Sequence, residues 1–420
     1  MHEPRIQHVV GRRVWDSRGR PTVEAEIFLD NGASGRAIAP AGASTGTHEA
    51  VDLRDGAGLG VDRAVANING EIADALRFLP IASQSAIDRR LIELDGTPNK
   101  ARLGGNATIA VSMAALHAAA AAHGQPLWRL LAEGGPVSLP MPMIQIFGGG
   151  VHAGRRVDIQ DFLIIPIGAA SFDEALAMAA RVYRAAGEIM AERSRLHGVA
   201  DEGGWWPEFA ANVEALDTLV MAIERAGLTA GKEIGIAIDV AASQFFQGGR
   251  YRLTADGTEL DTNGLIELLA QWCRRYPIVS VEDPVAEQDE AGMIGFTARV
   301  GDRLQVIGDD FLVTSAQRVA VAASRGACNA VLLKPNQAGT ITETKAALEA
   351  ARAAGWPTIV SARSGETEDV TIVHLAVGWN AGQLKVGSFA RSERMAKWNE
   401  GLRIEAGLGA AAVFAGWRRS

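Results

Sequence analysis

Alternating apolar and polar positions predict a β-hairpin near the beginning of the chain. Apolar residues occupy every second position from Val23 to Leu29, the period of a strand with one buried face. Asn31-Gly32 follows and is typical of a two-residue hairpin turn, so residues 35–40 are predicted to form the returning strand. From about residue 61 to 131, apolar residues recur three and four positions apart, which predicts helices. The first third is therefore expected to be an α+β unit.

Short, continuous apolar runs separated by helical stretches dominate the chain after residue 136. The eight runs are residues 141–147, 162–167, 234–240, 278–281, 304–307, 330–333, 358–360 and 383–386. Apolar strands that alternate with helices are typical of parallel strands buried on both faces, and eight of them predict a (β/α)₈ barrel. The first two runs leave no room for a helix between them, so the barrel is expected to begin irregularly. A doubly wound open sheet is the structural alternative.

Glycine and proline at Gly134-Gly135-Pro136 mark a change in composition that we interpret as a domain boundary. Residues 1–135 are predicted to form an N-terminal α+β domain, and residues 136–420 are predicted to form the barrel. A chain of 420 residues is long enough for one large barrel and a smaller domain.

Charge and cysteine content narrow the classes of function. The chain has 41 basic and 49 acidic residues and a net charge of −8, which argues against binding to a nucleic acid backbone. Cys273 and Cys328 cannot form a disulfide framework, and the first residues carry no apolar leader segment, so a cytoplasmic location is expected. The longest apolar stretch, residues 107–122, is mostly alanine, so it predicts a buried helix and no membrane partner.

Charged residues stand at the ends of four consecutive apolar runs: Asp239, Glu282, Asp309 and Lys334. Because the C-terminal ends of barrel strands converge, the three carboxylates are expected to form an all-oxygen site suited to Mg²⁺. A lysine beside the cation would have a lowered pKa and could act as a general base. Each residue alone is more often a turn, a helix cap or a solvated side chain, and the joint pattern favours the site.

Loops carry further candidate residues. Glu202, followed by two glycines, could supply a general acid, although a charge at a helix end is the simpler interpretation. The small residues of segment 40–46 could fold over a substrate as a lid. Arg363 and Lys385 could neutralise a phosphate or carboxylate. His152, after three glycines, could be an acid, a base or an orienting donor, or could be structural.

Longer motifs show that the chain resembles the enolase (phosphopyruvate hydratase) family over nearly its full length. The matching segments share the order and similar spacing of the family's motifs. They are residues 16–19, 42–46, 48–50, 94–100, 201–204, 239–243, 281–284, 336–337 with Lys334, 363–369 and 391–394.

This resemblance implies an α/β fold, with an atypical enolase-type (β/α)₈ TIM barrel preceded by an N-terminal α+β capping domain. It implies a cytoplasmic, glycolytic hydro-lyase that removes water from 2-phosphoglycerate to give phosphoenolpyruvate. The implied cofactor is Mg²⁺, with a second ion that arrives with the substrate. The implied partners are a small phosphorylated or phosphono hydroxy acid and further copies of the chain, in a homodimer or larger oligomer.

The resemblance also implies roles for individual residues. Lys334 would be the base, and Glu202 would be the acid that helps hydroxide leave. The first Mg²⁺ would be held by Asp239, Glu282 and Asp309, and Ser44 would help to hold the second. Substrate contacts would come from Gln160, Arg363, Ser364, Lys385 and Ser44, while His152 would close over the substrate and Asp161 would pair with the acid.

Three positions on the leaving-group and substrate side depart from the family pattern. Ala362 stands where the family has histidine, and alanine can neither donate nor accept a hydrogen bond through its side chain. Asp161 replaces a glutamate that is one methylene longer, so its pair with Glu202 must shift or admit water. Gly148 replaces an asparagine. The predicted magnesium ligands and the lysine base are all retained.

These departures leave several functions open. The chain could be an enolase with a weakened acid side, or a paralogue that acts on a related phosphono substrate, such as a carboxyphosphonoenolpyruvate synthase of phosphonate antibiotic biosynthesis. A non-catalytic enolase-fold binding protein would be expected to have lost metal ligands or the base, and none is lost. A sugar-acid dehydratase would share the metal-binding acids, but the lid segment, Arg363 and Lys385 favour a phosphorylated or phosphono acid.

Overall fold

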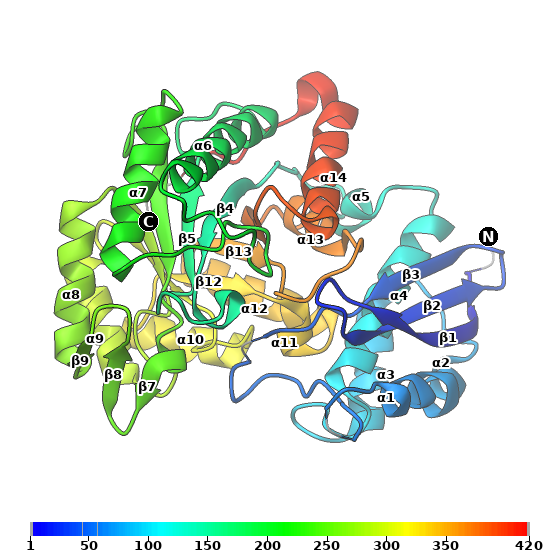
Figure 1. Ribbon diagram of the computed structural model, residues 1–420. Coiled ribbons are helices and arrows are strands. Elements are labelled where there is room, and N and C mark those ends of the chain that lie inside the picture. The colour runs from blue at the N-terminus through cyan, green and yellow to red at the C-terminus, as the bar shows by residue number, and fades with distance from the viewer. Residues whose placement is uncertain (1–2, 44, 57, 418–420) are drawn as a thin grey trace.

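Two units lie side by side in the computed structural model, which describes residues 3–43, 45–56 and 58–417 without the side chain of His152 (Figure 1). The N-terminal unit holds a three-stranded antiparallel sheet in the order β1-β2-β3. Its strands are β1 (Ile6–Trp15), β2 (Pro21–Leu29) and β3 (Ser34–Ile38). The predicted hairpin is confirmed, because β2 pairs with β3 across the Asn31-Gly32 turn. Strand β1 was not part of the predicted pattern.

Helix α4 (Gly105–Ala122) packs across this sheet and forms the centre of the N-terminal unit. A Cβ atom on Gly35 would lie 2.5 Å from the carbonyl carbon of His117, so glycine lets β3 approach the α4 backbone closely. Among the described residues, α4 is the one helix long and apolar enough to cross a membrane, and 83% of it is buried inside the protein. The predicted buried helix is confirmed. The surrounding helical elements are α1 (Asp62–Asn67), η1 (Ile68–Ile72), α2 (Ala73–Leu76), α3 (Gln84–Asp95) and α5 (Leu127–Leu131).

Each of the eight predicted apolar runs overlaps a barrel strand. The barrel is closed, in the order β10-β11-β12-β13-β14-β4-β5-β6, so the open-sheet alternative is wrong. The strands are β4 (Met141–Gly148), β5 (Asp161–Ile165), β6 (Gly235–Asp239), β10 (Ile278–Glu282), β11 (Gln305–Gly308), β12 (Ala330–Leu333), β13 (Thr358–Ser361) and β14 (Gly382–Gly387).

Strand β5 corrects the expectation that all the barrel strands are parallel. It runs antiparallel to both β4 and β6, while every other neighbouring pair in the barrel is parallel. The physical reason is the connection: a parallel pair needs a long crossover, and only a loop with the short helix η2 (Gly150–Ala153) joins β4 to β5. The irregular beginning of the barrel is thereby confirmed.

Helices surround the barrel (Figure 1). Apolar side chains such as Met143, Leu163 and Leu332 fill its interior. A small sheet of β7 (Phe246–Gln247), β8 (Arg250–Leu253) and β9 (Thr258–Leu260) was not predicted. The helical elements are α6 (Phe172–Glu192), α7 (Asn212–Arg225), η3 (Ala242–Phe245), α8 (Thr262–Arg275), α9 (Glu290–Val300), α10 (Ala316–Arg325), α11 (Pro335–Ala338), α12 (Ile341–Ala353), α13 (Thr371–Gly378), α14 (Ser392–Leu408) and η4 (Gly409–Ala411).

A pair of histidines lies where α4 meets the barrel helix α13. The His117 Nε2 atom is 2.8 Å from the Thr371 hydroxyl, and the ring centroids of His117 and His374 are 6.4 Å apart. Burial lowers the pKa of His374 to about 4, against an attraction to Glu400 and Asp369 that favours the charged form. Burial also lowers the pKa of His117. Both rings are therefore neutral in the folded protein near pH 7.

We predict that His374→Asn makes the protein less sensitive to acid. A histidine whose folded-state pKa lies below its unfolded value contributes stability above about pH 6.5, and this contribution is lost as the pH falls towards 4. The wild-type free energy of unfolding should lose about 3 kcal/mol more than that of the variant over this range. Urea unfolding at several pH values measures the difference. His8→Asn, at an exposed position on β1, is the control, and equal pH dependence in wild type and His374→Asn would contradict the prediction.

Candidate active site

The predicted charged residues converge at the C-terminal edge of the barrel strands. Asp239 ends β6, Glu282 ends β10, and the register of the two strands places these residues directly opposite each other. Asp309 follows β11 and Lys334 follows β12. Lys385 projects from β14 into the same group. All five residues are buried, so their charges interact in a poorly solvated environment.

The ammonium group of Lys385 bridges two of the carboxylates. Its Nζ atom lies 2.7 Å from Asp239 Oδ2, 2.8 Å from Glu282 Oε2 and 3.5 Å from Asp161 Oδ2. Burial opposes the charge of Lys385, but the surrounding carboxylates outweigh burial and raise its pKa well above the usual value. Burial, together with repulsion from Asp239, raises the pKa of Glu282. This edge of the barrel therefore holds acids in close contact and compensates them with a cation.

Lys334 donates from Nζ to Asp309 Oδ2, and Gln337 Nε2 donates to Asp309 Oδ1 at 2.9 Å. Burial alone would lower the pKa of Lys334, but the attraction of Asp309 and Glu282 is stronger and raises it. The fall in pKa expected from the sequence is that of a lysine beside a bound cation. The expected fall requires a second positive charge close to Asp309, because such a charge would weaken the hold of this carboxylate on the ammonium group.

The donor set fits a hard divalent cation. Asp239, Glu282 and Asp309 offer oxygen ligands only, which suits Mg²⁺. The Oε1 atom of Glu282 is buried and has no hydrogen-bond partner among the described residues, as expected for an oxygen that coordinates a metal ion. We therefore find that these residues fit magnesium.

A second acidic group lies beside this set and has a different arrangement. Carboxylate oxygens of Asp283, Asp309 and Asp310 lie within 4.8 Å of one another. Both oxygens of Asp283 accept backbone N–H groups, from Asp309 at 2.9 Å and from Asp310 at 2.8 Å. Asp283 therefore holds the loop after β11 in place, which orients Asp309 towards the site.

The loop that carries Glu202 is fixed from several sides, and Glu202 itself is buried. The Ser388 N–H donates to the Glu202 carbonyl at 2.9 Å, and the Tyr183 hydroxyl donates to the Gly203 carbonyl at 3.0 Å. Gly203 has φ of +89°, and a Cβ there would lie 3.0 Å from the Ala390 carbonyl carbon. Glycine at this position is therefore a requirement of the backbone.

One cavity brings together seven of the residues to which the sequence assigned catalytic or substrate-binding roles. These are Gln160, Asp161, Glu202, Lys334, Arg363, Ser364 and Lys385. Gly42 and Ala43 of the lid segment and Ala362 of the barrel complete much of the lining. The Ala43 N–H donates to the Ser364 hydroxyl at 2.6 Å, so the N-terminal unit closes one side of the cavity. The roles predicted for Ser44 and for the His152 side chain lie outside the described residues.

Sequence reasoning missed several residues that hold the site together. Glu49 pairs with Arg363 at 3.0 Å, and Arg394 donates to the Arg363 carbonyl at 2.6 Å. Gln145 contacts Asp161 from inside β4. A possible signal existed for Gln145, because it is the one polar residue of an otherwise apolar strand. Glu49 and Arg394 both lie inside family motifs, but nothing in the sequence assigned them a partner.

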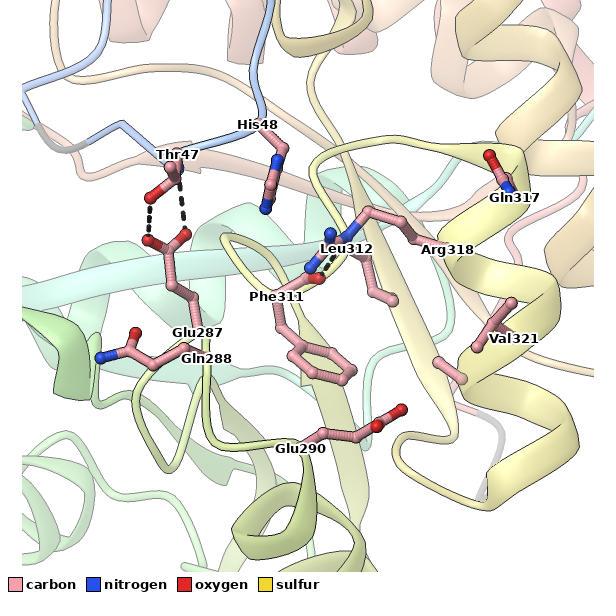
Figure 2. A pocket seen from close by; sticks show the side chains of 11 residues that line it. Thr47, His48, Glu287, Gln288, Glu290, Phe311, Leu312, Gln317, Arg318 and Val321 are labelled. Carbon is pink, nitrogen blue, oxygen red and sulfur yellow. Dashed lines mark hydrogen bonds between the residues drawn. The ribbon is translucent and has the colours of Figure 1, made fainter.

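A surface hollow of about 830 Å³ lies beside the lid segment (Figure 2). Figure 2 shows Thr47 above Glu287, whose carboxylate accepts the Thr47 N–H at 3.1 Å and also the Thr47 hydroxyl. Glu290 lies lower in the same hollow and pairs with Arg325 at 2.6 Å. Glu287 therefore ties Thr47, the residue directly after the lid segment, to the barrel, whereas Glu290 has no contact with Thr47 in the described structure.

The fold and the site define a capped α/β barrel with a buried carboxylate and lysine site at the C-terminal edge of its strands. The family model for the enolase C-terminal TIM barrel domain matches residues 136–420, and the model for the enolase N-terminal domain matches residues 6–131. The chain belongs to the enolase family. This membership supports a lyase activity of the enolase type, and enzymes of this family generally use Mg²⁺ and bind small phosphorylated substrates.

We predict that Glu287→Ala loosens the end of the lid segment and the residues that follow it. The variant removes two hydrogen bonds to a carboxylate, so amide hydrogen exchange of residues 45–49 should become about tenfold faster. Hydrogen exchange followed by mass spectrometry measures this rate. Glu290→Ala, which alters the same hollow without touching Thr47, is the matched control. Unchanged exchange of these amides in Glu287→Ala would refute the assigned contact.

Proposed function

We propose that the protein is a magnesium-dependent hydro-lyase that eliminates water from 2-phosphoglycerate to give phosphoenolpyruvate. The observation that carries the proposal is the shared cavity, in which a candidate base, Lys334, a candidate acid, Glu202, and the cationic groups of Arg363 and Lys385 meet. Elimination of water from a doubly anionic hydroxy acid needs this combination of base, acid and anion-binding groups.

In this proposal Asp239, Glu282 and Asp309 hold the first Mg²⁺, and Ser44 contributes to a second ion that arrives with the substrate. When bound, Mg²⁺ supplies positive charge that stabilises the charge developing on the substrate carboxylate. The buried, unpaired Oε1 atom of Glu282 supports this assignment.

Lys334 is the proposed base. Its neutral Nζ takes the proton from C2 of the substrate, and the electron pair of the C–H bond remains on the substrate. Asp309 accepts a hydrogen bond from the Lys334 ammonium group and raises its pKa, so the base becomes competent when that attraction weakens.

Glu202 is the proposed acid. As the bond between C3 and oxygen breaks, Glu202 gives its proton to the departing hydroxide, which leaves as water, and the electron pair from C2 forms the double bond. Asp161 lies in the same cavity and would pair with Glu202 in the transfer of the proton to the leaving group. Gln160, Arg363, Ser364 and Lys385 would bind the phosphate and carboxylate groups of the substrate, and His152 would close over it.

The proposal extends to the organisation of the protein. Residues 1–135 would act as the capping domain, because Gly42 and Ala43 line one side of the cavity, and residues 136–420 would act as the catalytic barrel. We propose a cytoplasmic, glycolytic role and a homodimer or larger oligomer, as the family resemblance implies.

A second candidate function is favoured by Ala362. This side chain lines the cavity together with Glu202, and its methyl group offers no hydrogen bond to a leaving group. An enolase paralogue that acts on a phosphono analogue, such as a carboxyphosphonoenolpyruvate synthase, would differ from an enolase in this part of the pocket. A non-catalytic binding protein is less well supported, because the candidate base and metal ligands are all in place.

We predict that pure protein with Mg²⁺ forms phosphoenolpyruvate from 2-phosphoglycerate and that Lys334→Ala abolishes this activity, with a fall of at least about 10³-fold. Absorbance of the product measures the rate. Lys345→Ala, on the partly exposed face of α12, removes a lysine far from the cavity lining and should keep wild-type activity. Absence of wild-type turnover, combined with magnesium-dependent binding of phosphono analogues, would favour the second candidate function.

A further inference from the structure

Gln145 is a polar side chain at the centre of an apolar strand. It is the one polar residue of β4 and is fully buried. Both ends of its amide are used. The Oε1 atom accepts the Gly204 N–H at 2.8 Å, and the Nε2 atom donates to Asp161 Oδ1. One side chain therefore joins the loop that carries Glu202 to the carboxylate of Asp161.

The backbone around Gln145 leaves room for this bridge. A Cβ atom on Gly204 would lie 2.9 Å from Gln145 Cδ, closer than real Cβ contacts come. A Cβ atom on Gly148 would lie 2.6 Å from the Ala200 side chain and 3.4 Å from Gln145 Nε2. Glycine at both positions lets the Glu202 loop pack directly onto the Gln145 amide.

Other contacts hold the Glu202 loop without reaching Asp161. The Tyr183 hydroxyl and the Ser388 N–H bind main-chain carbonyls of the loop. Gln145 links this loop to Asp161 through a single side chain, and Lys385 Nζ is a further contact of Asp161, at 3.5 Å from its Oδ2 atom. The position of the Asp161 carboxylate relative to the Glu202 loop therefore depends in part on the length of this amide.

We propose that Gln145 is a positioning residue that sets the geometry of Asp161 and Glu202, and that its long side chain compensates for the short side chain of Asp161. The inference rests on the proposed function, in which these carboxyl groups serve the departure of hydroxide. It predicts that one methylene can be exchanged between positions 145 and 161: shortening the amide breaks the bridge, and lengthening the acid restores it.

The test uses Gln145→Asn, Asp161→Glu and the double variant, with two rates measured on each protein. The first is elimination of water from 2-phosphoglycerate. The second is exchange of the substrate C2 proton with deuterium from the solvent, which reports the Lys334 step alone. Because a misplacement of about 1 Å can cost about 10²-fold in rate, Gln145→Asn should slow elimination by about 10²-fold. Proton exchange should change by less than about threefold, since the Lys334 side of the cavity does not contact Gln145.

The double variant should eliminate water at least about tenfold faster than Gln145→Asn. A merely structural role would not produce this rescue. Two results would overturn the inference. One is elimination at the wild-type rate in Gln145→Asn. The other is a double variant whose elimination rate is no higher than expected when the fold-changes of the two single variants are multiplied. Absence of both proton exchange and elimination in the wild type would instead mean that the proposed function has failed.

A nearly isosteric variant covers the case in which Gln145→Asn does not fold. Gln145→Met keeps the length of the side chain and removes both of its hydrogen bonds, to the Gly204 N–H and to Asp161. Elimination should again slow by about 10²-fold, while proton exchange changes by less than about threefold. Equal slowing of both rates, or of neither, would contradict a role confined to the acid side.

Discussion

Compensation of buried charge at one edge of the barrel is the constraint on which the rest of the structure depends. Three carboxylates, on Asp239, Glu282 and Asp309, are held out of water within reach of the two lysines that contact them. Acids buried together repel one another, and leaving any of these charges without a partner would be strongly destabilising. Strand register, loop anchors and the direction of each side chain must therefore agree, because an error at one strand end would leave a charge uncompensated.

The same constraint explains why the N-terminal unit is fixed to the barrel through ionic contacts. Arg363 is buried beside the acids, and its guanidinium pairs with Glu49 from the N-terminal unit. Glu49 also accepts from the side-chain nitrogen of Gln337, which donates to Asp309 as well. A connected network thus runs from the lid side of the cavity to the strand end that carries a candidate metal ligand.

The fold was largely predictable because its signals are local. Eight apolar runs produced eight strands, and charged residues at strand ends met because barrel topology brings those ends together. The reversed direction of β5 could not be derived, since periodicity is the same in parallel and antiparallel strands. The raised pKa of Lys334 and the partners of Gln145 were equally inaccessible, because both depend on side chains that come from distant parts of the sequence.

The departures from the family pattern are not independent of one another. Gln145 donates a hydrogen bond to the short side chain of Asp161. Because Gly148 has no side chain, it avoids a collision with Ala200 beside the Gln145 amide. These two departures therefore belong to one packing arrangement that keeps the acid side in order. Ala362 stands apart, because its methyl group cannot form the hydrogen bonds of a histidine and the cavity lining gains no described polar group in its place. The choice between an enolase and a paralogue with a modified substrate accordingly depends on Ala362 more than on Asp161.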